Sequence, residues 1–129
     1  MKKILIFVFS IFTFMNFSNV SAQENDDLLN VIAKSLPEQY IKSKANLFFT
    51  IQIGAYTNKN AKLASLEHVI VVKESDNLNK YRLGEFNSYE EAKDYKNMLL
   101  SVCKDAFIVS IKNGKRIHIT EALKDLPAI

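Results

Sequence analysis

The sequence contains little cysteine, glycine or proline, and each shortage excludes a class of protein. Its 129 residues include one cysteine, three glycines and two prolines. The single cysteine, Cys103, can form neither an intramolecular disulfide nor a metal site made of several thiolates. So few glycines and prolines exclude a collagen-like chain and a Pro/Gly-rich disordered chain. A content of 48% hydrophobic and 24% charged residues is instead typical of one globular domain.

The motifs of nucleotide-binding and metal-dependent enzymes are also missing. The sequence contains no GxxxxGK[ST] or GxGxxG loop. Its two histidines, His68 and His118, do not stand in an HExxH or another metal-ligand spacing. The carboxylates of Glu90 and Glu91 fit the first turn of a helix, where they complement the helix dipole. We therefore expect a protein that is not an enzyme and that needs no metal ion or cofactor.

Most of the net positive charge comes from the N-terminal segment. The formal net charge is +3, and removal of Lys2 and Lys3 leaves +1. An apolar run then extends from Ile4 to Met15, and small residues close the segment at Ala22. This order is that of a secretory signal peptide, and the run is shorter than the roughly 20 residues that span a membrane. We expect cleavage of residues 1–22 and a periplasmic or otherwise exported protein without a membrane anchor.

An internal repeat organises the rest of the chain. Residues 51–56 align with residues 81–86, and each copy is an alternating strand that ends in glycine, one residue and an aromatic. We expect Gly54 and Gly84 to end their strands, where the chain turns sharply toward a helix. This order, repeated twice, predicts an α+β fold, a ferredoxin-like βαββαβ two-layer sandwich. The expected helices span 59–67 and 89–102, and the strands that follow them span 69–72 and 106–111.

Turn and cap signals refine this prediction. Ser88 and Glu91 have the spacing of a helix capping box. Asn113-Gly114 predicts a tight hairpin that adds a fifth strand at the edge of the sheet. Thr120 is expected to cap a short C-terminal helix, which Pro127 ends. Cys103 follows an apolar helical stretch and is expected in or near the core.

Residues 23–46 allow two interpretations. Leu28, Leu29, Ile32 and Leu36 have helical spacing, and Pro37 would end that helix. The segment either packs on the domain or serves as a tether, and the sequence does not decide between them.

Strand alternation predicts one sheet face without helices. Both helices of such a sandwich cover the same side of the sheet, so polar strand residues should point outward on the other side. One alternative is that these positions are only solvated. The other is that they form the working surface, centred on Gln52 and Arg82. The inward set is Ile51, Ile53, Tyr81 and Leu83, and the outward set is Thr50, Gln52, Lys80 and Arg82.

These motifs resemble a known family. The stretch Phe49–Tyr56, followed by Lys80–Phe86 and by Asp105–Val109, is similar to a SPOR domain. The resemblance implies an RNP-like βαββαβ fold and binding to peptidoglycan glycan strands that lack stem peptides, which accumulate at the division septum. It extends from Phe48 to Ile111, and the hairpin and short helix that follow resemble an extension found in some members. We therefore divide the chain into a signal peptide (1–22), an N-terminal helix or tether (23–46) and a SPOR-like domain (47–126).

The resemblance also implies a glycan-binding site. Lys80 stands where the family commonly has arginine, and it keeps the charge but lacks the planar fork of donors. Leu78 stands where an aromatic is frequent, and it cannot offer a ring face to a sugar. Glycan affinity is then either weaker than in the family or restored by Tyr56 and Arg82. The expected glycan-binding residues are Gln52, Ala55, Tyr56, Leu78, Lys80, Arg82 and Phe107.

A second function remains open. The same sheet face, or the hairpin that contains Arg116, would equally suit a protein–protein interaction module of the cell envelope. An RNA-binding role is not expected, because the strands lack the aromatic-rich pattern of RNA-binding sheets and the protein is exported. The expected partners are peptidoglycan glycan strands or envelope proteins, with no nucleic acid.

Overall fold

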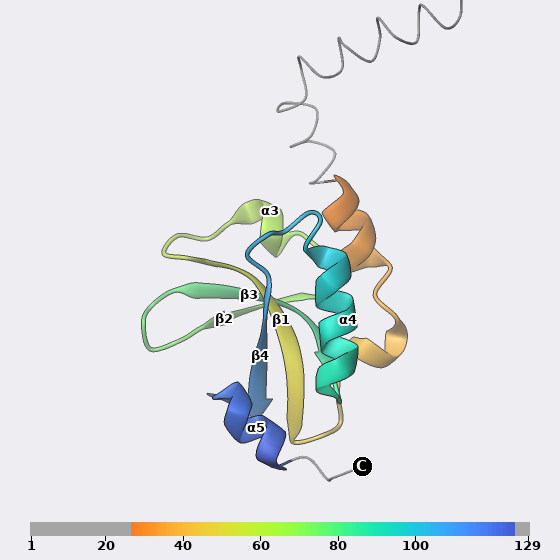
Figure 1. Ribbon diagram of the computed structural model, residues 1–129. Coiled ribbons are helices and arrows are strands. Elements are labelled where there is room, and N and C mark those ends of the chain that lie inside the picture. The colour runs from red at the N-terminus through yellow and green to blue at the C-terminus, as the bar shows by residue number, and fades with distance from the viewer. Residues whose placement is uncertain (1–26, 126–129) are drawn as a thin grey trace, which may run out of the picture.

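The computed structural model describes residues 27–125, in which a five-stranded antiparallel sheet is covered by helices (Figure 1). The expected signal peptide at residues 1–22 and Pro127 lie outside the described residues. The strand order β2-β3-β1-β4-β5 confirms the predicted α+β, ferredoxin-like sandwich and its fifth strand. The strands are β1 (Leu47–Tyr56), β2 (Val69–Lys73), β3 (Asn79–Phe86), β4 (Phe107–Lys112) and β5 (Lys115–Ile117), and the helices are η1 (Glu38–Tyr40), α3 (Ala61–Ala64), α4 (Tyr89–Leu99) and α5 (Ile119–Asp125).

The hydrophobic core lies between the sheet and its helices. The predicted inward set is confirmed, because Ile51, Tyr81 and Leu83 are fully buried and Ile53 nearly so. Cys103 is partly buried against this core, and burial raises the pKa of its thiol. Among residues 27–125, the structure contains no helix with the length and apolar character that a membrane span requires.

The repeated glycines lie inside β1 and β3, so the expectation that they end their strands is wrong. Gly84 has φ +81°, and a Cβ added there would lie 2.5 Å from Cε2 of Phe86. A Cβ on Gly54 would lie 2.7 Å from Cε2 of Tyr56. In each repeat the aromatic two residues later therefore covers the glycine. The pairing of β1 with β3 also shifts register beside each glycine, which is typical of β-bulges.

Both repeat helices are shorter than predicted, although their starts are well capped. The side chain of Asn60 accepts a hydrogen bond from Leu63 N at 3.1 Å and starts α3. At α4 the predicted capping box is confirmed, because Ser88 Oγ accepts from Glu91 N at 3.2 Å and donates to its carboxylate at 2.8 Å. The helix ends at Leu99 rather than at residue 102.

The C-terminal hairpin forms as predicted, but the helix after it is capped differently. Asn113 and Gly114 have φ values of 50° and 80°, as a tight hairpin turn requires. Helix α5 begins at Ile119, so Thr120 lies inside the helix and the prediction that it is the cap is wrong. The ring Nδ1 of His118 accepts a hydrogen bond from Thr120 N at 3.3 Å instead.

The N-terminal segment is part of the folded domain. Residues 27–34 form a helix beside α4 in the helical layer (Figure 1). Ile32 is buried, and its carbonyl accepts a hydrogen bond from Tyr95 Oη at 2.9 Å. Burial raises the pKa of Tyr95 to about 12. In η1 the ring of Tyr40 packs on Phe86, with 4.6 Å between ring centroids. Residues 27–40 therefore pack on the domain, and they leave the opposite sheet face uncovered.

Candidate ligand-binding groove

The sheet face opposite the helices carries a cavity of about 910 Å³. Its floor is formed by β3 and β4, and its walls are the turn between β2 and β3 on one side and the β4–β5 hairpin on the other. No residue of the segment 27–46 lines it. We call this cavity the groove. The lining residues include Glu74, Asp76, Lys80, Arg82, Phe107, Val109, Lys115, Arg116 and His118.

The predicted polar residues on this face are buried rather than exposed. Gln52 is 3% exposed, and Lys80 and Arg82 are each 6% exposed. Thr50 is equally inaccessible. Gln52 pairs with Arg82 across β1 and β3, so the two equivalent positions of the repeat lie side by side. Strand alternation thus assigned these side chains to the right face, but the expectation that they point into solvent is wrong.

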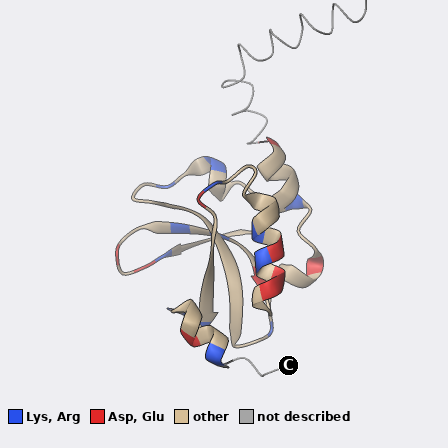
Figure 2. Ribbon diagram, in the orientation of Figure 1, with Lys and Arg blue, Asp and Glu red and all other residues tan. Residues whose placement is uncertain are grey.

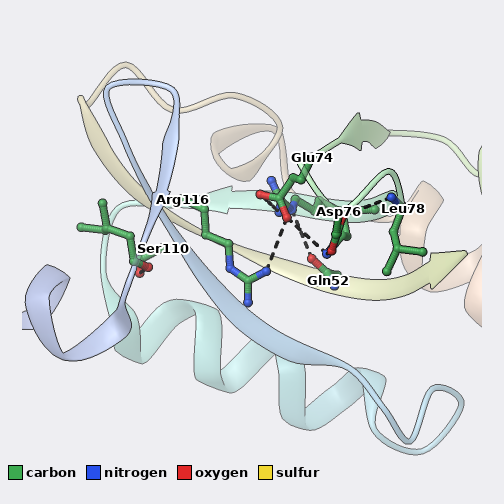
Figure 3. A network of polar contacts seen from close by, with 9 residues as sticks. Gln52, Glu74, Asp76, Leu78, Ser110 and Arg116 are labelled. Atoms are coloured by element: carbon green, nitrogen blue, oxygen red, sulfur yellow. Dashed lines mark hydrogen bonds and ion pairs between the residues drawn. The ribbon is translucent and has the colours of Figure 1, made fainter. Parts of the chain in front are cut away.

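Glu74 holds three cationic side chains together over the sheet (Figure 3). Its carboxylate oxygens lie 3.0 Å from Arg82 Nη2, 3.3 Å from Lys80 Nζ and 3.5 Å from Arg116 Nη1. Asp76 binds Lys80 Nζ at 2.8 Å from the same turn. Figure 2 shows these acidic positions on the turn beside basic positions of the strands. This arrangement explains how Lys80 and Arg82 can be buried, because buried charges require partners.

Arg82 is bound with imperfect hydrogen-bond geometry in this network. Its Nε donates a long hydrogen bond, 3.4 Å, to Gln52 Oε1. Its Nη2 is buried and lies 3.0 Å from a Glu74 carboxylate oxygen, in an ion pair whose geometry falls short of a good hydrogen bond. A buried donor without a well-aligned acceptor is rare and costly in proteins. The network is therefore ion-paired but incompletely satisfied.

The two carboxyl groups of the network titrate below their ordinary range. Burial would raise the pKa of Glu74, but the contacts and charges of Arg82 and Lys80 outweigh burial and lower it. The hydrogen bond from Lys80 lowers the pKa of Asp76, as does the backbone N–H of Leu78. Both carboxylates therefore stay charged at neutral pH and neutralise part of the cationic floor.

We expect acid to destabilise the protein through Glu74. A carboxyl group with a lower pKa in the folded state stabilises the fold above its unfolded pKa, about 4.3 for Glu. That contribution is lost as the pH falls through the folded pKa. The free energy of unfolding, measured in urea at pH 7 and pH 3, should fall less in Glu74→Gln than in the wild type. An equal decrease in the two proteins would contradict the assignment.

Phe107 supplies the apolar part of the groove. It lies at the start of β4, opposite Gln52, and is 42% exposed. The guanidinium carbon of Arg116 lies 5.9 Å from the centroid of its ring. An exposed aromatic beside buried cationic donors can contact the apolar face and the polar edge of one ligand together.

Tyr56 lies away from the groove. Its ring packs edge-on against Tyr81, which belongs to the helical side, with 6.1 Å between ring centroids, and it covers Gly54. The register shift between Gln52 and Gly54 inserts one extra residue into β1. Because side chains alternate between faces, such a slip moves the following residues to the opposite side. Tyr56 therefore cannot restore the aromatic contact that Leu78 lacks.

Ala55 and Leu78 lie at the margin of the site. Ala55 pairs with Lys80 across β1 and β3 and is exposed, but it does not line the groove. Leu78 follows Asp76 in the turn, and its backbone N–H donates to the Asp76 carboxylate at 3.0 Å. Its side chain points away from the ionic network in Figure 3. Of the seven predicted residues, Lys80, Arg82 and Phe107 line the groove, and Gln52 supports it from below.

The acidic residues were missed at the sequence level. Asp76 and Lys80 lie four residues apart across a tight turn, and this spacing was the available signal for their ion pair. Glu74 and Arg116 are far apart in sequence and meet because two turns converge over the same face. A periodic sequence pattern cannot predict an ion pair between two such distant residues.

A second cavity, of about 440 Å³, lies between the N-terminal helix and α4. It is lined mainly by apolar side chains, including the exposed Val31 and Met98. Of its two carboxylates, Glu91 and Asp94, the first already accepts a hydrogen bond from Tyr40 Oη at 2.6 Å. This cavity offers fewer convergent polar groups than the groove.

Comparisons with protein-family models, curated proteins and solved structures found no match to this chain. Within residues 27–125, no three His, Cys, Asp or Glu side chains are grouped as they would be to bind a metal ion. The groove on the open sheet face is the strongest candidate site in the described part of the chain.

Proposed function

We propose that this protein is an exported, non-catalytic module that binds peptidoglycan glycan strands in the groove. The observation that supports it best is the combination of a concave sheet face, buried donors on its floor and one exposed aromatic, Phe107, at its side. A volume of about 910 Å³ lies within the range of ligand sites. The resemblance to SPOR domains and the leader at residues 1–22 agree with this proposal.

Noncovalent contacts would hold the sugar. A glycan strand offers hydroxyl and acetamido groups at its edges and C–H groups on its faces. Arg82 and Lys80 would donate hydrogen bonds to sugar oxygens, and Gln52 would hold Arg82 in place from below through its side-chain oxygen. Phe107 would cover an apolar sugar face, as exposed aromatics do in binding sites. We further propose that strands without stem peptides, which mark the division septum, are the preferred ligand.

The direct test is co-sedimentation of the chain from Gln23 onward with purified sacculi, before and after amidase treatment. All the buried core residues described here lie between Leu29 and Ala122, so this chain contains the core. Greater retention on amidase-treated sacculi is the expected result. No retention on either material, together with saturable binding to an envelope protein, would replace the glycan function with the protein-interaction function.

Truncation of Phe107 should weaken retention strongly. We expect Phe107→Ala to raise the apparent Kd for amidase-treated sacculi by about tenfold or more, because a few aromatic anchors carry much of the binding energy of a site. Tyr56→Ala is the matched control, since Tyr56 is 44% exposed and Phe107 42%. It removes a similar ring outside the groove and should leave the Kd close to that of the wild type. The reverse order of effects would move the site to the other face.

A further inference from the structure

The groove concentrates positive charge. Five of its lining residues are cationic and two are carboxylates, a formal excess of three positive charges. The whole chain carries only +3. A cavity with one sign of charge in excess attracts ligands of the opposite sign. The cationic residues are Lys73, Lys80, Arg82, Lys115 and Arg116, and the carboxylates are Glu74 and Asp76.

Two of these cations, Lys80 and Arg82, lie deep in the groove, whereas the carboxylates lie nearer its edge. The side chains of Lys80 and Arg82 are each 7% exposed, whereas Glu74 is 21% and Asp76 47% exposed. Glu74 approaches Lys80, Arg82 and Arg116 from the turn between β2 and β3. Its carboxylate therefore covers the cationic floor from the solvent side.

The contact between Glu74 and Arg82 is incomplete. The Nη2 atom of Arg82 is buried beneath Glu74 and lies 3.0 Å from one of its carboxylate oxygens, but the geometry is too poor for a good hydrogen bond. A guanidinium group binds a carboxylate best through two parallel N–H···O bonds. Glu74 is held by its turn, with one carboxylate oxygen near Arg82 and the other near Lys80 and Arg116. It therefore does not make two parallel hydrogen bonds with Arg82. A free carboxylate entering from solution can.

We infer that Glu74 occupies a carboxylate subsite and that the carboxylate of an acidic sugar displaces it during binding. The inference rests on the proposed glycan function and names the group that the groove recognises. Phe107 beside Arg116 places an apolar surface next to the subsite for the ring that bears the acid. A stem peptide is joined to the glycan by an amide on the lactyl carboxylate of N-acetylmuramic acid. Removal of the peptide restores that carboxylate, which gives a physical reason for a preference for peptide-free strands.

Displacement of Glu74 makes the internal carboxylate a competitor of the ligand. If the subsite is free of Glu74 in only a fraction of the molecules, the apparent affinity for the ligand is reduced to that fraction of its intrinsic value. Glu74→Gln removes the competing charge and adds one positive charge to the excess in the groove. We expect this variant to bind N-acetylmuramic acid about tenfold more tightly than the wild type does. Glu90→Gln makes the same change of net charge on α4 and should leave the affinity unchanged.

The experiment is a titration of the ¹⁵N-labelled chain from Gln23 onward, followed by NMR of backbone amides and arginine side chains. N-acetylmuramic acid should shift the signals of Arg82, Arg116 and Glu74. N-acetylglucosamine, which lacks the lactyl carboxylate, should bind at least tenfold more weakly. This comparison uses the wild-type protein, so it holds even where Glu74→Gln does not fold.

Equal binding of the two sugars would overturn the inference, as would a folded Glu74→Gln variant that binds no more tightly than Glu90→Gln. Inorganic phosphate is titrated in parallel, and tighter binding of phosphate than of the sugar acid at these residues would also overturn the assignment to a sugar carboxylate. Sacculus retention separates this inference from the proposed function. If the protein is retained on sacculi but binds the two sugars equally, only the carboxylate subsite is ruled out. If it binds N-acetylmuramic acid but is not retained on sacculi, only the peptidoglycan function is ruled out.

Discussion

Gly84→Ala is expected to lower the free energy of unfolding by about 2 to 4 kcal/mol, because it combines two costs. The residue has φ +81°, a conformation that L-residues with a Cβ adopt only at a cost. The new methyl group would also lie 2.5 Å from Cε2 of Phe86, whose ring is fully buried and cannot move aside without disturbing the core. Urea unfolding followed by circular dichroism measures the loss.

Gly114→Ala separates these two costs. Gly114 has φ +80°, almost the value of Gly84, but an added Cβ there meets no atom within 4 Å. Its substitution should therefore show the conformational cost alone, about 1 to 2 kcal/mol. Equal losses in the two variants would mean that the ring of Phe86 adapts freely, and the packing explanation of the glycine–aromatic motif would then be wrong.

Removal of residues 1–45 is expected to abolish cooperative folding. The deletion removes Leu29, Ile32 and Leu36 from the core, and each buried aliphatic side chain contributes about 1.5 to 3 kcal/mol. Their sum is comparable with the whole stability of a small domain, about 5 to 15 kcal/mol. It also removes Tyr40 from Phe86 and leaves the Tyr95 hydroxyl without its acceptor. A urea titration of the shortened chain should show no sigmoidal transition.

Two point variants in the same helix provide the control for this deletion. Ile32 is 8% exposed, and Ile32→Ala should lower the free energy of unfolding by about 2 to 4 kcal/mol. Val31, its neighbour, is 57% exposed, and Val31→Ala should change it by less than about 0.5 kcal/mol. A fully cooperative transition of the shortened chain, or equal effects of the two substitutions, would show that the helix does not stabilise the domain.

The fold was predictable because its signals are local and repeated. Two copies of the strand–glycine–aromatic pattern, each followed by a helix and an apolar strand, were enough to predict the sheet and its covered face. The Asn113-Gly114 hairpin and the Ser88 cap are short-range chemistry and were also predicted. The place of Thr120 was not, because the ring of His118 takes over the role of cap, and histidine is not among the usual cap residues.

The site was predictable only in part, since bulges and long-range ion pairs leave no periodic trace. Alternation correctly assigned Gln52, Lys80 and Arg82 to one face. It could not report the extra residue in β1, which turns Tyr56 to the helical side. Strand alternation also could not predict the place of Glu74, because that place depends on how the turn between β2 and β3 folds over the sheet. The predicted site therefore contained the cations without their counter-charges.

The positive and negative charges of the groove come from two different parts of the fold. The buried cations stand on β3, whose other face is core, whereas the opposing acids stand on a turn that contributes no core residue. Substitutions in that turn can therefore retune ligand choice while the interior stays intact. If the groove binds ligand as proposed, exchange of a few residues at 74–78 would change what it recognises.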